Sequence, residues 1–172
     1  METTTLKLIL LYALDQMEIP VTKDTLNDMC CSQNNWLTYM TLAEILPELV
    51  SARFIAMYTS GGTEYYKITQ EGRDCLNYFF IKIPTSIRND IGNFIKKNRQ
   101  SYKRKQEYFK DYHKNKDGSY TVNLRITDPT CSKLEIKLNV ANRGEAITAF
   151  NKWNESAGEV YSAIYKILID GE

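Results

Sequence analysis

The chain has 172 residues, of which 43% are hydrophobic and 25% are charged, and its formal net charge at pH 7 is +1. This composition is typical of a soluble globular protein, and the length is sufficient for two small domains. No apolar run is long enough to cross a membrane, and the N-terminus lacks the features of a secretory signal. The four cysteines follow no disulfide or metal-binding spacing, which favours reduced thiols and a cytoplasmic location.

The charges are unevenly distributed along the chain. Residues 1–87 contain six Lys or Arg and ten Asp or Glu, whereas residues 88–116 contain ten and three. Residues 117–172 contain six and eight. The positive charge is therefore concentrated in one segment, which is a candidate surface for nucleic acid, although most charged runs are simply solvated.

Two helices are expected near the N-terminus. From Leu6 to Met17, apolar residues follow a helical period and occupy nearly the whole circumference, which predicts a helix buried on two sides, as in a dimer. Ile19-Pro20 would end this helix. A short second helix would turn Leu26, Met29 and Cys30 inward.

A third helix is indicated by another apolar stripe, which ends at Phe54. Thr41-Leu42-Ala43-Glu44 matches a capping box, although Asn35 could cap an earlier start. Pro47 lies inside the pattern, so we expect a kink or an irregular start. The stripe consists of Leu42, Ile45, Leu46, Leu49, Val50 and Phe54.

The most informative segment runs from Phe54 to Leu76. Two β-rich runs, residues 54–59 and 64–69, flank the turn Ser60-Gly61-Gly62-Thr63, which predicts a hairpin. A fourth helix is expected over residues 70–80. Three helices, a hairpin and a closing helix together predict a winged helix-turn-helix, a fold used mostly to bind DNA.

The pattern changes after Ile83-Pro84. A helix is expected from Thr85, and because its apolar stripe lapses through residues 96–105, we expect the helix to end near there. Asp117-Gly118 is a hairpin signal, so residues 106–114 are expected to form a strand, with a helix continuing to Tyr112 as the alternative.

The last third of the chain predicts a sheet covered by a helix. Residues 120–126 and 134–140 alternate apolar and polar side chains, as half-buried antiparallel strands do, with a turn at Asp128-Pro129. Apolar residues from Ala146 to Ile167 step by four and three, which predicts a long helix over about residues 143–169 that Gly158 or residues 154–156 could break. This helix would cover the apolar face of the sheet.

The predicted fold class is therefore α+β. An N-terminal winged helix-turn-helix domain would occupy residues 1–84, and a basic connecting helix residues 85–105. A small C-terminal α+β domain, with antiparallel strands covered by a long helix, would occupy residues 106–172.

Several motifs carry a resemblance to known families. Leu46 and Leu49, Phe54-Ile55, and Tyr66-x-Ile68-Thr69-x-x-Gly72-x-x-x-Leu76 match the pattern of bacterial winged-helix transcriptional regulators of the PadR and MarR kind, which the first half resembles. The whole chain resembles an uncharacterised bacterial family that couples such a module to a C-terminal αβ segment. That second resemblance depends on Phe79-x-x-x-Ile83-Pro84-x-Ser86-Ile87-Arg88 and on Asn151-x-Trp153 followed by Tyr161-x-x-Ile164.

No catalytic or metal site is predicted. The single histidine, His113, lies in a polar run without a nucleophile motif. The sequence contains no Gly-rich phosphate loop and no metal-ligand cluster. We therefore expect a protein without enzymatic activity and without a cofactor.

The predicted DNA contacts fall into three groups. Base readout would come from the start of the third helix, one phosphate contact from the wing, and the remaining positive charge from the basic segment, where Tyr102 and Tyr108 are interleaved. These residues are Asn35, Thr38, Tyr39 and Thr41; Lys67; and Lys96, Lys97, Arg99, Lys103, Arg104 and Lys105. Against DNA binding, Glu44 and Glu48 lie on the outward face of the third helix, and the wing tip has no Arg or Lys.

We expect a cytoplasmic, homodimeric transcriptional regulator that binds double-stranded DNA. Its C-terminal domain would serve dimerisation or the sensing of an effector or protein partner. The alternative retains the fold without the DNA: a winged-helix module that binds another protein.

Overall fold

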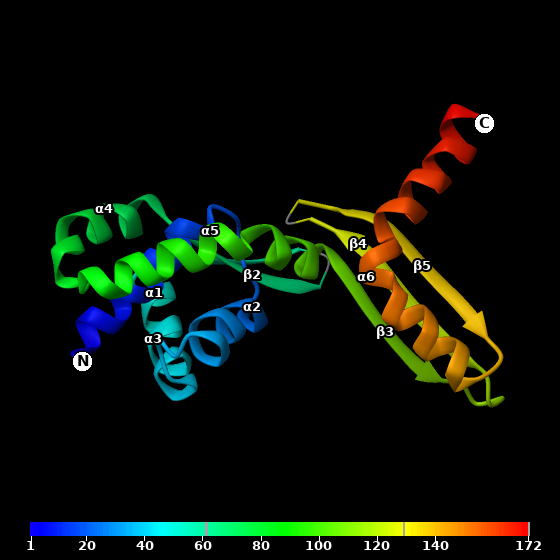
Figure 1. Ribbon diagram of the computed structural model, residues 1–172, viewed down its shortest axis with the longest axis horizontal. Coiled ribbons are helices and arrows are strands. Elements are labelled where there is room, and N and C mark those ends of the chain that lie inside the picture. The colour runs from blue at the N-terminus through cyan, green and yellow to red at the C-terminus, as the bar shows by residue number, and fades with distance from the viewer. Residues whose placement is uncertain (61, 129, 172) are drawn as a thin grey trace. The chain divides into compact units, whose positions relative to one another are not determined.

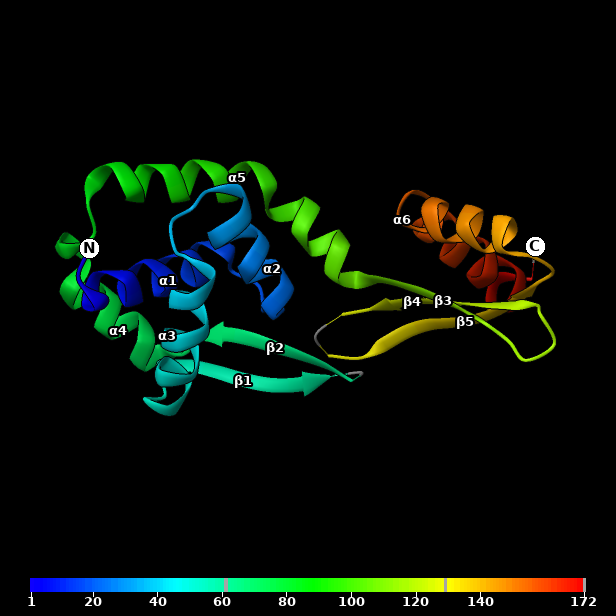
Figure 2. The same cartoon turned by 90° about the horizontal axis from the view of Figure 1, so that it is seen from below.

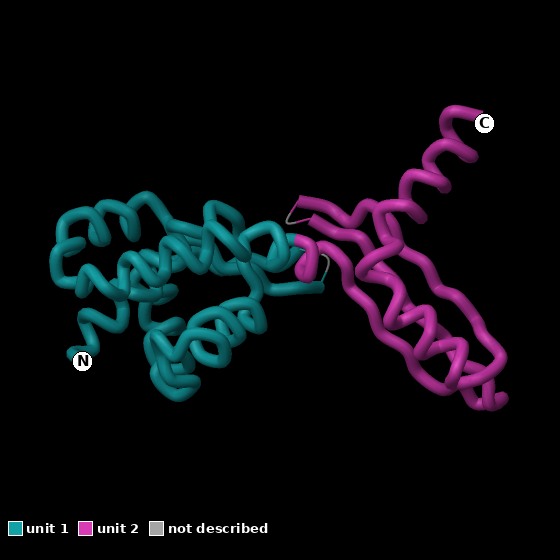
Figure 3. The backbone as a smooth tube through the Cα atoms, viewed as in Figure 1, with its two compact units in different colours: residues 1–103 teal, residues 104–172 magenta. Residues whose placement is uncertain are grey.

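The computed structural model describes residues 1–60, 62–128 and 130–171. It divides the chain into two compact units, residues 1–103 and 104–172 (Figure 3). Helices accompany one small antiparallel sheet in each unit, so the fold is α+β. Gly61 and Pro129, on which two predicted turns depend, lie outside the described residues.

Helix α1 (Thr3–Met17) runs through the middle of the first unit (Figure 2). Its residues Leu8–Leu11, Ala13, Leu14 and Met17 are all buried in the core of that unit. Glu18 adopts a left-handed conformation with φ 59°, so the helix ends before Ile19-Pro20, as predicted. Since the unit itself buries the apolar residues of this helix, the apolar pattern of α1 is explained without the dimer contact that we expected there.

Helix α3 begins earlier than its predicted capping box. Helix α2 (Lys23–Asn27) continues into a π-helical turn (Asp28–Gln33), and α3 spans Tyr39–Ser51. The N-cap is Thr38, because its hydroxyl oxygen accepts a hydrogen bond from the Thr41 amide at 3.1 Å. The prediction of a cap at Thr41 is therefore wrong, since Thr41 already supplies one of the free amides of the first turn.

The predicted hairpin is confirmed. Strands β1 (Ile55–Ser60) and β2 (Thr63–Ile68) pair antiparallel, with Ile55 opposite Ile68 and Ser60 opposite Thr63. Val21, between α1 and α2, exchanges two backbone hydrogen bonds with Tyr66, at 2.9 and 2.8 Å. This bridge ties the hairpin to the helices of the first unit.

Helix α5 (Thr85–Glu107) is longer than its apolar stripe predicted. It follows α4 (Gln70–Phe79) and the 3₁₀ turn Phe80–Lys82. Ile91, Ile95 and Tyr102 remain buried along its inner side. The helix ends at Glu107, two residues beyond the predicted range 85–105, so Gln106 and Glu107 are helical and do not begin the predicted strand. Lys, Arg and Gln are good helix formers, so a few inward residues suffice to hold the helix.

The second unit is a three-stranded antiparallel sheet with a helix on one face (Figure 1). The strand order is β3 (Tyr108–Lys114), β4 (Tyr120–Thr127) and β5 (Ser132–Val140). The structure thus confirms the strand over Tyr108–Lys114, rather than a helix. Gly118 closes the β3–β4 hairpin with φ 87°, as the Asp117-Gly118 pair predicted.

Helix α6 (Arg143–Tyr165) covers the sheet and continues as a π-helical turn, Lys166–Asp170. Its residues Ala146, Trp153 and Ala157 are buried against Val122, Leu124 and Ile126 of β4. The helix is not broken at Gly158 or at residues 154–156, so that alternative is excluded. Its final turns extend past the β5 edge of the sheet (Figure 1).

Candidate nucleic-acid interface

Trp36 anchors the start of α3 to α5. Its ring nitrogen donates a hydrogen bond to Asp90 Oδ2 at 2.6 Å, and its ring lies edge-on to Phe94 with centroids 5.6 Å apart. Asn35 precedes it, exposed and left-handed with φ 52°. Tyr39, in the first turn of α3, is 60% exposed. Two of the predicted base-reading side chains, Asn35 and Tyr39, therefore lie on the surface beside the Trp36 anchor.

The other two predicted base-reading residues hold the helix start together. The hydroxyls of Thr38 and Thr41 lie 2.8 Å apart, and the Thr38 hydroxyl also accepts from the Thr41 amide. These contacts occupy the hydroxyl groups that base readout would need. Thr38 and Thr41 therefore contribute first to the stability of the cap.

The outward face of α3 is acidic and apolar. Glu44 and Glu48 are exposed together with Met40, Ala43 and Pro47. Glu48 Oε2 forms an ion pair with Lys7 Nζ at 2.6 Å, which neutralises one of the two carboxylates. This face provides little attraction for phosphate groups.

Lys67 is exposed on the hairpin, as predicted. Its ammonium lies 5.5 Å from the centroid of the Tyr58 ring, in cation–π geometry. Tyr58 and Tyr65 stack with centroids 5.8 Å apart on the same pair of strands. Lys67 is therefore the one predicted contact that the hairpin contributes.

The basic residues of α5 have different roles. Lys96, Lys97 and Lys103 are exposed in the first unit, whereas Arg104 and Lys105, also exposed, belong to the second. Arg99 donates a hydrogen bond to the Gln16 carbonyl at 2.6 Å and approaches Glu18 at 3.5 Å. Arg99 thus caps the end of α1, where free carbonyls attract cations, and is less available to DNA.

Tyr102 and Tyr108 do not form an aromatic surface among the lysines. Tyr102 is 5% exposed, and its hydroxyl donates to Asp28 Oδ2 at 2.7 Å. Burial and then this carboxylate raise the pKa of Tyr102 above its usual value. Tyr108 packs against the core of the second unit. The prediction that these rings interleave with the basic residues on a binding surface is therefore wrong.

The structure brings some predicted contacts together and separates others. Trp36 contacts Phe94, and Lys97 follows Phe94 by one helical turn, about 4.5 Å along the axis. Lys97 thus lies on the side of α5 that carries the Trp36 contact, whereas Lys96, two residues after Phe94, faces another side of the helix. The hairpin lies on the opposite side of α1 from α5 (Figure 2), so Lys67 is not part of that group.

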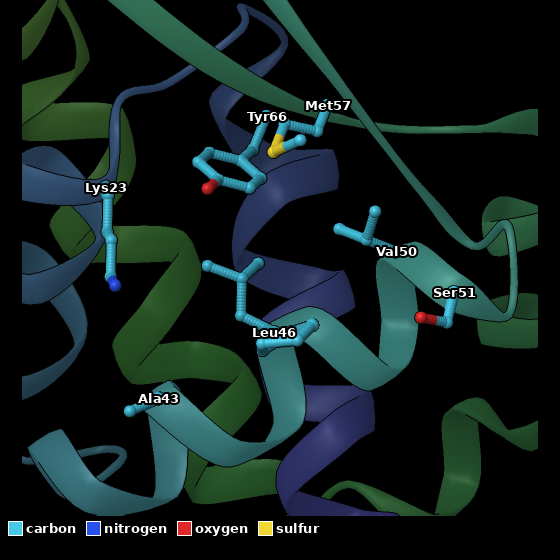
Figure 4. Close-up of a pocket in the computed structure, with 8 residues that line it drawn as sticks. Lys23, Ala43, Leu46, Val50, Ser51, Met57 and Tyr66 are labelled. Carbon is cyan, nitrogen blue, oxygen red and sulfur yellow. The ribbon is translucent and has the colours of Figure 1, made fainter.

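A groove that the sequence did not predict lies between α3, the start of α2 and the hairpin (Figure 4). Its volume is about 240 Å³. Leu46 and Val50 point toward Tyr66 and Met57, and Lys23 flanks one end. The full lining consists of Lys23, Ala43, Leu46, Pro47, Val50, Ser51, Met57 and Tyr66.

Pro47, one of the lining residues, interrupts the hydrogen-bond pattern of α3. Proline has no amide hydrogen, so it cannot donate to the carbonyl of Ala43 one turn earlier. The Tyr66 hydroxyl donates a hydrogen bond to Glu64 Oε2 at 3.4 Å, and burial, followed by this carboxylate, raises the pKa of Tyr66 above its usual value. A proline inside an exposed helix and an outward methionine on the hairpin were the sequence signals of the groove.

None of the described His, Cys, Asp and Glu side chains gather in threes or more as a metal site requires. None of the described helices combines the length and apolar character needed to cross a membrane.

Comparison with known proteins gives one family match. The model of the family described as "Domain of unknown function (DUF4364)" matches residues 6–168. The chain belongs to this family. No match was found among curated proteins or among solved structures. The DUF4364 match spans both units, as expected from the resemblance of the whole chain to an uncharacterised family.

Proposed function

We propose that the first unit of this DUF4364 protein is a winged helix-turn-helix, and that the protein is a DNA-binding transcriptional regulator. The pairing of Val21 with Tyr66 carries the proposal, because it joins the β1–β2 hairpin to the chain between α1 and α2. A three-helix core with a small sheet beside it is the arrangement that this fold requires.

The proposed DNA surface is the start of α3 together with the exposed lysines of α5. Asn35 and Tyr39 supply hydrogen-bonding groups at the surface. The exposed Lys96 and Lys97 of α5 supply positive charge, with Lys97 one helical turn beyond the Trp36–Phe94 contact. Phosphate neutralisation contributes most of the affinity, and base contacts contribute sequence preference. Lys67 is left as a peripheral contact.

The remaining parts of the proposal concern assembly and location. The regulator would act in the cytoplasm as a homodimer, with the second unit providing dimerisation or the sensing of an effector. Twofold symmetry would present two copies of the α3 start to the two halves of a palindromic site.

Substitutions that remove positive charge test the proposed DNA surface. Because each lysine that contacts a phosphate contributes about 0.9 to the slope of log K against log salt, Lys96→Gln with Lys97→Gln should reduce that slope by about 2. Binding of fluorescent duplex DNA, followed by anisotropy at several salt concentrations, measures the slope. Lys152→Gln, on the exposed side of α6, is the matched control.

Asn35→Ala separates base readout from phosphate binding. It should leave affinity for random duplex nearly unchanged but reduce the preference among sequences selected with the unmodified protein. An unchanged salt slope in the lysine variant, together with unchanged preference in the Asn35 variant, would show that the DNA surface is elsewhere.

One observation favours a second candidate function. The groove between α3 and the hairpin, and the exposed Met40, Ala43 and Pro47 beside it, are better suited to a protein segment than to DNA. In that case the first unit would be a protein-interaction module. Absence of DNA binding by the unmodified protein would favour this candidate.

A further inference from the structure

Strand β5 is a free edge of the second sheet. Within the described residues it pairs with β4 on one side only, over its nine residues Ser132–Val140. An edge of this length is a template for another strand unless the chain blocks it. The strand contains no proline, and its one irregularity lies at its start, where the register shifts beside Thr127.

The inner face of β5 is poorly covered by its own helix. Leu138 is 45% exposed, whereas Val122, opposite it on β4, is fully buried. Leu134, Ile136 and Val140 are only half-buried. Helix α6 therefore covers the middle of the sheet and leaves part of the β5 side open.

The end of α6 presents a second unpaired apolar surface. The large apolar side chains of this segment are between 36% and 73% exposed, which corresponds to an apolar area on the order of 500 Å². Figure 1 shows that this segment leaves the sheet on the β5 side. We call it the α6 tail; its large apolar residues are Tyr161, Tyr165, Ile167, Leu168 and Ile169.

The sequence of β5 is complementary to itself. In an antiparallel pair of two β5 strands with Ile136 on the twofold axis, Glu135 lies opposite Lys137 of the partner subunit. The symmetry repeats this pair, and it also places Leu134 opposite the partner's Leu138. Opposite charges and apolar residues that face each other across strands both stabilise a sheet.

We propose that a second copy of this chain pairs with β5 to form one continuous six-stranded sheet. Each α6 tail then covers the open Leu138 side of the partner subunit's sheet. The paired strands and the two tails together approach the roughly 800 Å² per partner of a standard protein interface. This inference rests on the homodimer in the proposed function, and it does not depend on DNA binding.

Charge exchange across the axis tests this register. Lys137→Glu alone places like charges opposite each other twice, and so does Glu135→Lys alone. Each variant should dissociate at least tenfold more readily than the unmodified dimer in sedimentation velocity without DNA. An equimolar mixture should recover dimers, because Lys137→Glu in one copy faces Glu135→Lys in the other. This recovery cannot come from variants that fail to fold.

The α6 tail has its own variant. Leu168→Asp, at a position 73% exposed, should weaken the dimer at least tenfold, whereas Lys152→Glu should leave it unchanged. A protein that is monomeric at about 100 µM would overturn the proposal. Dimers that survive both single charge variants unchanged would equally overturn it, because they would place the interface elsewhere.

Discussion

Gly72 lies where α4 meets the backbone of Phe54. A Cβ atom at this position would lie 2.2 Å from the Phe54 carbonyl oxygen, and that oxygen already accepts hydrogen bonds from Thr69. Thr69 in turn caps α4 by accepting from the Gly72 amide at 3.0 Å. The Thr69-x-x-Gly72 motif is therefore both a helix cap and a point of close backbone approach.

Gly72→Ala should destabilise the first unit by about 2 kcal/mol or more, because backbone atoms must move to admit the methyl group. Gly92→Ala, in the middle of α5, is the matched control, since its new Cβ would meet only the Tyr12 hydroxyl at 3.8 Å. That control should be neutral or stabilising by up to about 1 kcal/mol. Urea denaturation measures both changes, and equal effects would contradict this account of the motif.

At the scale of single elements, Asp128 organises the connection into β5. Its carboxylate accepts hydrogen bonds from the amides of Thr130 and Cys131, at 2.8 and 2.9 Å, and Lys133 Nζ lies 3.4 Å away. The hydrogen bonds from Thr130 and Cys131, with a smaller contribution from Lys133, hold the pKa of Asp128 well below its usual 3.8. The charged form is therefore favoured in the folded state.

This pKa predicts how the stability of the second unit depends on pH. A lowered pKa contributes stability that is present above about pH 4 and is lost as the pH falls below it. Asp128→Asn should therefore flatten the acid limb of the stability curve between about pH 4 and pH 2. Thermal unfolding across this pH range measures how steeply stability falls with pH. Asp111→Asn, at an exposed position of β3, is the control. Identical acid limbs in the unmodified protein and in Asp128→Asn would refute the prediction.

At the scale of the whole molecule, sequence periodicity predicted the helices and strands well, but it did not predict which polar side chains contact one another. The hairpin, the three-stranded sheet and the long α6 followed from spacing and turn residues, because such patterns report which face is buried. The end of α5 was predicted to within two residues, although its apolar stripe lapses earlier, since a charged helix needs few buried residues to continue. The roles of Arg99 and Tyr102 depend on Gln16 and Asp28, which are distant in sequence, so no local pattern could reveal them.

The residues of the candidate site were partly predictable from the sequence, but their arrangement in space was not. Exposed side chains such as Asn35, Tyr39, Lys96 and Lys97 could be named from their residue types and from their places at a helix start or in a basic segment. Their grouping depends on the Trp36 hydrogen bond to Asp90, which joins segments far apart in the chain. The groove beside α3 arises only when α2, α3 and the hairpin pack together.

The most direct test of DNA binding uses the unmodified protein and random duplex DNA across a salt series, beginning at about 50 mM. We expect binding at low salt that weakens steeply, with log K falling linearly against log salt, because phosphate contacts release counterions. No binding even at the lowest salt would contradict the proposed regulator, and would leave the groove between α3 and the hairpin as the surface to study.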